Sequence, residues 1–161
     1  MIVLVMGTTG AGKTTIGTIL ARRLGWTFLD ADDFHPAANI EKMKKGIPLT
    51  DADRAPWLAA IHAELERRSK AGENVVLACS ALKQKYRDKI SAGLDVKVVY
   101  LKGSYETMRR HIEERHGHFA GAGILAGQFA DLEEPKDAIV VDVSKTPEEI
   151  VSEVRACLKP G

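Results

Sequence analysis

The sequence holds few cysteines, no long apolar run and no excess of charge of either sign. Cys79 and Cys157 form no C-x-x-C pair and show no metal-ligand spacing, so we expect two reduced thiols in a cytoplasmic protein. The apolar segment 2–6 lacks a basic flank and is too short for a signal peptide or a membrane span. A net charge of +1, from 23 basic and 22 acidic residues, argues against nucleic acid as the main partner.

Internal repeats, low-complexity tracts and linkers are also missing. The chain of 161 residues is therefore expected to form a single domain, 1–161, with one substantial core. A hydrophobic content of 45% with 28% charged residues is typical of an ordinary globular protein rather than a disordered or fibrous one.

Apolar runs alternate with segments of helical spacing along the whole chain. The predicted strands are 2–6, 26–30, 74–80, 96–101 and 138–143, and the predicted helices are 13–24, 37–45, 50–71, 82–90, a segment capped by Ser104 and a last one that begins at Thr146. Such alternation predicts an α/β fold: a doubly wound, five-stranded parallel sheet flanked by helices. Ligands of such sheets bind beyond the carboxyl ends of the strands.

The segment 7–14, GTTGAGKT, fits the phosphate-loop pattern G-x-x-x-x-G-K-[ST] between a predicted strand and a predicted helix. Its glycines let the backbone turn its N–H groups towards phosphate oxygens. Lys13 is placed to reach the β- and γ-phosphates of ATP, and the hydroxyl of Thr14 to bind Mg²⁺. The predicted nucleotide-binding residues here are Gly7, Thr8, Thr9, Gly10, Ala11, Gly12, Lys13, Thr14 and Thr15.

Two classes of nucleotide-binding protein lack support in this sequence. A GTPase should carry an N-K-x-D guanine motif, and the chain has none. A motor or AAA-type ATPase usually carries a strand that ends in Asp-Glu, whereas the third predicted strand leads into Cys79 and Ser80. Asp30, at the end of the second predicted strand, is then the best candidate for the carboxylate on the metal side. These features favour a small-molecule kinase with a mobile lid.

The segment 29–36, LDADDFHP, places three carboxylates within four positions. Asp30 and Asp32 would share one side of an extended chain. One can hold the hydration shell of Mg²⁺, and the other can accept a proton from an attacking hydroxyl or orient it. For Asp33 a turn role is favoured. His35, held extended by Pro36, is predicted either to bind an acceptor hydroxyl or to fix the turn.

The chain resembles the gluconokinase family, within the shikimate-kinase-like P-loop kinases. The resemblance is carried by GTTGAGKTT, LDADDFHPAANIEKMKKGIPLTDADRAPWL, CSALKQKYRD, VYLKG, GHF, QFADLEEP and VVDV, which occur in the family's order over nearly the whole chain. It implies transfer of the ATP γ-phosphoryl to the 6-hydroxyl of D-gluconate. It also implies a homodimer, with Asp32 as the base-like residue and Asp30 on the metal side.

A sugar acid needs a cation for its carboxylate and hydrogen-bond partners for its hydroxyls. Arg54 and Arg87 are the favoured carboxylate ligands because a guanidinium binds two oxygens at once. Lys83 is a weaker candidate, four residues before Arg87 and so expected on the same helical face. Gln128 is predicted to contact a hydroxyl. A surface role remains the alternative for each of these cations.

The glycine-rich segment 115–127 is predicted to be a lid that closes over the site and excludes water. By resemblance, Arg115 stabilises charge on the transferring phosphoryl, and Arg109 precedes it on the nucleotide side. The segment 143–147, which ends at Pro147, resembles a loop that contacts adenine. The resemblance gives no role for His118.

Two alternatives stay open at this point. One is a kinase for another small hydroxy acid such as shikimate, whose carboxylate would also suit an arginine pair. The other is a nucleotide-dependent switch or binding module without acceptor chemistry, against which the acid-rich segment 29–36 counts.

Overall fold

The structure, a computed structural model, describes residues 1–116 and 122–158. The GHF mark and the centre of the predicted lid lie outside these residues. Within them, no helix is both long enough and apolar enough to cross a bilayer.

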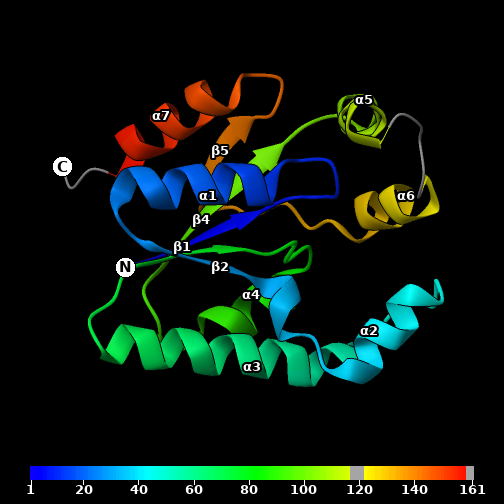
Figure 1. Cartoon of the computed structure of the whole chain (residues 1–161), viewed down its shortest axis with the longest axis horizontal. Helices are drawn as coiled ribbons and strands as arrows, with labels where there is room; N and C mark the ends of the chain where they lie inside the picture. The colour runs from blue at the N-terminus through cyan, green and yellow to red at the C-terminus, as the bar shows by residue number, and fades with distance from the viewer. Residues whose placement is uncertain (117–121, 159–161) are drawn as a thin grey trace.

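One parallel sheet of five strands organises the chain, in the order β2-β3-β1-β4-β5 (Figure 1). The strands are β1 (Ile2–Met6), β2 (Thr27–Asp30), β3 (Val75–Ala78), β4 (Val96–Lys102) and β5 (Ile139–Asp142). β1 lies in the middle, paired with β3 on one side and with β4 on the other. The predicted doubly wound sheet is confirmed, and the loops that follow β1, β2 and β3 meet at its carboxyl edge.

The side chains of β1 alternate between two cores, because successive residues of a strand point to opposite faces. Val3 and Val5 pack into one core, on the face covered by α1 (Lys13–Leu24) and α7 (Pro147–Leu158). Leu4 and Met6 pack into the other core, on the face covered by α3 (Asp51–Lys70) and α4 (Gln84–Ser91) (Figure 1). All five residues of β1 are buried, as expected of a central parallel strand.

Local capping explains where several helices begin. Thr50 and Asp53 form the predicted capping box of α3, with Thr50 N donating to Asp53 Oδ2 and Asp53 N donating to Thr50 Oγ1. Ser104 Oγ accepts from Thr107 N before α5 (Tyr105–His116). Thr146 Oγ1 accepts from Glu149 N at the start of α7. These side chains satisfy backbone donors that a first helical turn leaves unpaired.

One helix start was predicted wrongly, and two other segments adopt conformations that the sequence left open. Residues 31–34 form a 3-10 turn (Ala31–Phe34) rather than extending the strand, because Asp30 Oδ1 accepts from Asp32 N and caps the turn. α4 begins at Gln84, and Lys83 lies outside it in an extended conformation. The predicted lid segment runs into a helix, α6 (Ala122–Asp131), despite its glycines.

Three helices lie beyond the carboxyl edge of the sheet (Figure 1). α6 lies beyond the carboxyl end of the strands together with α5, on the side of α1 (Figure 1). α2 (Ala37–Lys44) lies beyond the same end on the side of α3 (Figure 1).

Candidate active site

The phosphate loop joins β1 to α1 with the backbone geometry that its glycines permit. Gly10 and Gly12 have φ angles of 84° and 86°, in the left-handed region where a side chain is strained. A Cβ on Gly10 would also lie 2.7 Å from the carbonyl oxygen of Met108 in α5. Lys13 Nζ donates to the carbonyl of Thr8 at 3.0 Å, across the loop. The loop is thus preformed around the lysine that should meet the phosphates.

Two side chains, one from α5 and one from α6, contact the phosphate loop, and the sequence did not single out either contact. His111 Nδ1 lies 2.9 Å from the carbonyl oxygen of Gly10, and this oxygen can only accept a hydrogen bond. Gln128 Oε1 accepts from Thr9 N at 2.6 Å. Gln128 Oε1 is thus engaged with the phosphate loop, and its contact with an acceptor hydroxyl stays a prediction.

Lys13 is partly buried and lies among charged side chains of both signs. Burial lowers the pKa of Lys13, and the nearby carboxylates of Asp32 and Asp30 act in the opposite direction. Arg115, exposed near the end of α5, lowers the pKa of Lys13 further and is therefore close enough for its charge to act there. The predicted catalytic cations and carboxylates thus converge on one place.

Thr14 and Asp30 present two oxygens side by side. Thr14 Oγ1 donates to Asp30 Oδ2 at 3.3 Å, from the first turn of α1 to the end of β2. Mg²⁺ binds oxygen ligands and in kinases usually keeps several waters, with one or two protein oxygens and the phosphates completing its shell. A hydroxyl beside a carboxylate fits this ion, and no cluster of three or more acidic, His or Cys ligands occurs in the described chain.

Asp32 lies in the 3-10 turn that follows β2. Partial desolvation raises the pKa of Asp32, and the like charge of Asp30 raises it further, while His35 and Lys13 act against both. A carboxylate with a raised pKa is a better proton acceptor than an ordinary one. Asp32 therefore has the electrostatic character expected of a residue that receives or orients a hydroxyl proton.

His35 is stacked on Trp57, with ring centroids 4.4 Å apart and ring planes 10° apart. Trp57 is buried in α3, and its Nε1 donates to the carbonyl of Ala31 at 2.7 Å. Burial lowers the pKa of His35; Asp32 opposes this effect and Arg54 reinforces it. The structure therefore brings His35 together with two other predicted acceptor residues, Asp32 and Arg54.

Arg54 and Lys83 gather around Tyr86. The Arg54 guanidinium lies 5.4 Å from the Tyr86 ring centroid and donates to Tyr86 Oη at 3.2 Å. Lys83 Nζ lies 5.9 Å from the same centroid. Tyr86 Oη in turn donates to Asp51 Oδ1 at 2.7 Å. Two of the cations predicted to bind the acceptor carboxylate thus lie against the same aromatic ring, one from α3 and one from the β3–α4 turn.

Arg87 lies apart from Arg54 and Lys83, and its surroundings do not support the predicted role in binding the acceptor carboxylate. It is only 3% exposed, and its guanidinium donates to the carbonyls of Ala81 at 2.7 Å and Glu133 at 2.7 Å. Ala81 has a φ angle of 45°, a strained value for alanine. Arg87 therefore holds the strained β3–α4 turn in place rather than facing a ligand, and Lys83 and Arg87 do not share a helical face.

A pocket of about 360 Å³ adjoins the phosphate loop on the nucleotide side. Thr15, Arg115 and Pro147 line it together with Gly10 and His111, as expected for a nucleotide base or ribose beside the loop. Arg109, also predicted on this side, forms ion pairs with Glu106 and Glu113 of its own helix.

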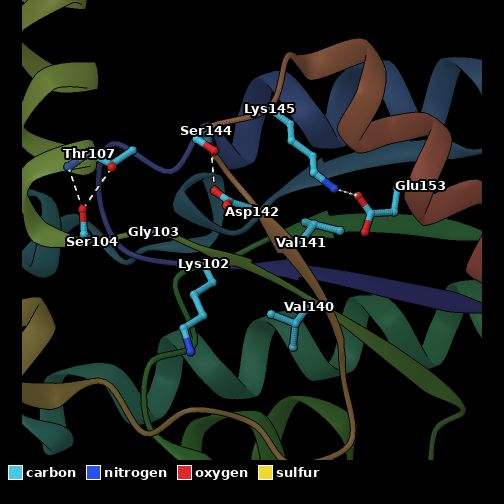
Figure 2. A pocket seen from close by; sticks show the side chains of 10 residues that line it. All are labelled: Lys102, Gly103, Ser104, Thr107, Val140, Val141, Asp142, Ser144, Lys145 and Glu153. Atoms are coloured by element: carbon cyan, nitrogen blue, oxygen red, sulfur yellow. Dashed lines mark hydrogen bonds and ion pairs between the residues drawn. The ribbon is translucent and has the colours of Figure 1, made fainter.

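A second hollow, of about 690 Å³, lies at the β5 edge of the sheet (Figure 2). Its charged side chains are already paired: Lys145 with Glu153 at 2.9 Å and Lys102 with Glu134 at 3.0 Å. Figure 2 also shows Ser144 N bonded to Asp142. Because the charged groups that line this hollow are paired within the protein, we assign no ligand to the hollow.

Comparison with known proteins gives the same picture. The family described as an AAA domain matches residues 2–135, which include the phosphate loop and the acidic segment. A gluconokinase of Gluconobacter oxydans is 46% identical over 154 residues, covering 93% of this chain and 86% of that protein. The crystal structure of a gluconokinase from Sinorhizobium meliloti superposes with a TM-score of 0.88 at 42% identity, covering 96% of this chain and 89% of the other.

A shikimate kinase from Aquifex aeolicus is far more distant, with 16% identity and a TM-score of 0.59, which shows a common fold alone. The closer matches extend over the acceptor side as well as the nucleotide-binding core. The chain therefore belongs to the gluconokinase family of P-loop kinases.

Proposed function

We propose that the protein transfers the γ-phosphoryl group of ATP to the 6-hydroxyl of D-gluconate, giving 6-phospho-D-gluconate. The observation that carries the proposal is the acceptor side of the site. Lys13 of the phosphate loop and His35 both act on the carboxylate of Asp32, and Arg54 acts in turn on His35. A hydroxy acid could thus place one end at the phosphates and its carboxylate at a cation.

The nucleotide end is built from the phosphate loop. Backbone N–H groups of the loop and Lys13 neutralise the negative charge of the phosphates, and the N-terminus of α1 adds its positive dipole end. Thr14 and Asp30 would hold Mg²⁺, which neutralises charge on the phosphates and so favours their transfer. Arg115 would stabilise charge on the same group from the lid side.

The acceptor end requires a proton acceptor and a carboxylate anchor. Asp32 receives or orients the proton of the attacking hydroxyl, a role that its raised pKa supports. Arg54 binds the acceptor carboxylate, and Lys83 lies at the same tyrosine to add a second positive charge. His35 contacts a hydroxyl between the two ends.

The remaining parts of the proposal come from the resemblance and from composition. The chain acts as one kinase domain, with residues 115–127 as a lid that excludes water. Two free cysteines and the use of ATP fit a cytoplasmic enzyme. A homodimer remains a prediction from the resemblance.

The proposal is tested by coupled ADP release with D-gluconate, other sugar acids and shikimate as acceptors. We expect release with D-gluconate and a 6-phosphorylated product by NMR. Release with shikimate but not with gluconate would overturn the substrate. No acceptor-stimulated release with any compound would favour a nucleotide-dependent binding module.

A further inference from the structure

Asn39 in α2 is a buried polar residue for which the proposed reaction gives no role. It is 3% exposed, although α2 is otherwise a largely solvent-facing helix. Its side-chain Nδ2 donates to the carbonyl oxygen of Asp53 at 2.9 Å and lies 3.2 Å from His35 Nδ1. A buried amide is costly unless it is hydrogen-bonded, so both contacts bear on why it is there.

The contact with Asp53 fixes which way the amide points. A backbone carbonyl can only accept a hydrogen bond, so the atom that faces Asp53 must be the NH₂ nitrogen. Its second hydrogen is then directed at His35 Nδ1. That nitrogen must accept, and a neutral imidazole with Nδ1 as acceptor carries its proton on Nε2.

The imidazole ring is also held in its plane. It stacks on Trp57, and Trp57 is bonded to the carbonyl of Ala31, the residue before Asp32. Turning the ring over would point a carbon at the Asn39 amide and lose the hydrogen bond. Stacking fixes the plane, and Asn39 fixes the rotation within that plane.

The charge state agrees with this geometry. Burial lowers the pKa of His35, and the positive charge of Arg54 lowers it too, against the opposing effect of Asp32. A protonated His35 would direct an Nδ1–H at the N–H of Asn39, donor against donor. Both effects favour the neutral ring.

We propose that Asn39 is a positioning residue that holds His35 as the neutral Nε2–H tautomer, so that His35 offers a hydrogen-bond donor to an oxygen of the acceptor. The inference rests on the proposed function for the identity of that acceptor. It assigns the chemical class that His35 selects: a hydroxyl or carboxylate oxygen with a free lone pair. An acceptor that lacks this oxygen would leave the donor unpaired, which sites of this kind reject strongly.

The test begins with ¹⁵N NMR of the full-length protein labelled at histidine, with the His35 signals assigned by comparison with His35→Gln. We expect the wild-type protein at pH 8 to show a non-protonated Nδ1 and a protonated Nε2. A protonated Nδ1 in the wild type would overturn the proposal. This measurement does not depend on which acceptor the enzyme uses, or on whether it phosphorylates one.

Asn39→Asp provides the matching variant, because a carboxylate accepts where the amide donated. We expect the proton to move to Nδ1 and the KM for D-gluconate to rise about tenfold, with the KM for ATP within about twofold. Ile40→Ala, at an exposed neighbour on α2, is the control and should change neither. A shifted tautomer with an unchanged KM for gluconate would show that the donor does not contact the acceptor.

If Asn39→Asp fails to fold, Asn39→Ser keeps a small polar group at the site. We expect it to give a mixture of the two tautomers with an intermediate KM for gluconate. A single Nε2–H tautomer in this variant would show that another group sets the proton.

Discussion

At the scale of single residues, the crowded carboxylates of segment 29–36 have different surroundings. Asp30 bonds to Thr14 and to the backbone N–H of Asp32. For Asp32, desolvation and the like charge of Asp30 raise the pKa, and the opposing effects of His35 and Lys13 are smaller. The two carboxylates therefore differ in environment: Asp30 is hydrogen-bonded to Thr14, and Asp32 has the raised pKa of a proton acceptor.

The coupling between these two acids can be measured directly. We expect the Asp32 carboxyl to titrate above 3.8 in the wild-type protein and at a lower pH in Asp30→Asn, because the substitution removes a like charge. Carboxyl ¹³C NMR titration reports both values. An unchanged or higher pKa in the variant would contradict the assigned cause.

Asp32→Asn should reduce kcat by 10²-fold or more, since general-base assistance is worth about that much.

Substitution of Arg54 and of Arg87 should have different effects, one on acceptor binding and the other on the stability of the fold. Arg54→Leu should raise the KM for gluconate with little change in the free energy of unfolding, because this side chain is partly exposed. Arg87→Leu should lower the free energy of unfolding by about 3 kcal/mol, since it leaves buried carbonyls without their charged donor. Urea denaturation and steady-state kinetics on both variants decide between the two roles. The reverse pattern would restore Arg87 as an acceptor ligand.

At the scale of elements, α2 is fastened to the start of α3 through Asp53. The Asp53 carboxylate accepts from Thr50 N and from Lys42 Nζ, the latter at 2.9 Å to each oxygen. The carbonyl oxygen of Asp53 also accepts a hydrogen bond from Asn39 Nδ2. One residue thereby sets both the first turn of α3 and the position of the helix that carries Asn39.

This fastening should depend on pH. The hydrogen bond from Thr50 N, followed by that from Lys42, lowers the pKa of Asp53 from 3.8 to about 2. A folded-state pKa below the unfolded value adds stability above the unfolded pKa, and this contribution is lost as pH falls through the folded pKa. We expect the stability difference between wild type and Asp53→Asn to be constant near neutral pH and to shrink between about pH 4 and pH 2. Thermal denaturation across that range measures it; a difference independent of pH would contradict the ion pair.

Gln128 tests whether α6 acts on the phosphate loop or on the acceptor. Gln128→Leu leaves Thr9 N without its partner, so we expect nucleotide affinity to fall about fivefold, the equivalent of about 1 kcal/mol. The KM for gluconate should stay unchanged. Calorimetric titration with a non-hydrolysable ATP analogue gives the first quantity and kinetics the second. A selective rise in the KM for gluconate would instead support the contact predicted from sequence.

At the scale of the whole molecule, the site exists because loops from three parallel strands meet at one edge. The phosphate loop follows β1, the acidic turn follows β2, and the strained turn held by Arg87 follows β3. β1 lies between β3 and β4, so ATP and its acceptor meet where the connections diverge.

We expect Mg²⁺ to strengthen nucleotide binding at this edge of the sheet. A non-hydrolysable ATP analogue at about 100 times its Kd should stabilise the protein by about 2.7 kcal/mol. Removing Mg²⁺ with a chelator should weaken analogue binding in the wild type and have much less effect in Asp30→Asn. Thermal shift with and without the metal measures both. An equal dependence on Mg²⁺ in the two proteins would remove Asp30 from the metal site.

The sequence by itself determined the sheet, the phosphate loop and most helix starts, because these depend on local signals. Apolar runs buried on both faces predicted the strands to within one or two residues at each end, and capping residues such as Thr50 marked helix starts. The loop motif required only glycines, a lysine and a threonine in order. The acidic segment was also recognised, although the sequence did not predict the 3-10 turn that it forms.

Only the tertiary structure decided what several polar side chains do. Arg87 and Gln128 have the right chemistry for an acceptor, but the fold also places backbone groups 46 and 119 positions away in the chain within their reach. The role of Asn39 likewise depends on Asp53 and on the ring orientation of His35. Sequence spacing specifies which residues can share a helix or strand, whereas the direction of a buried hydrogen bond is set by whichever donor or acceptor the fold places opposite it.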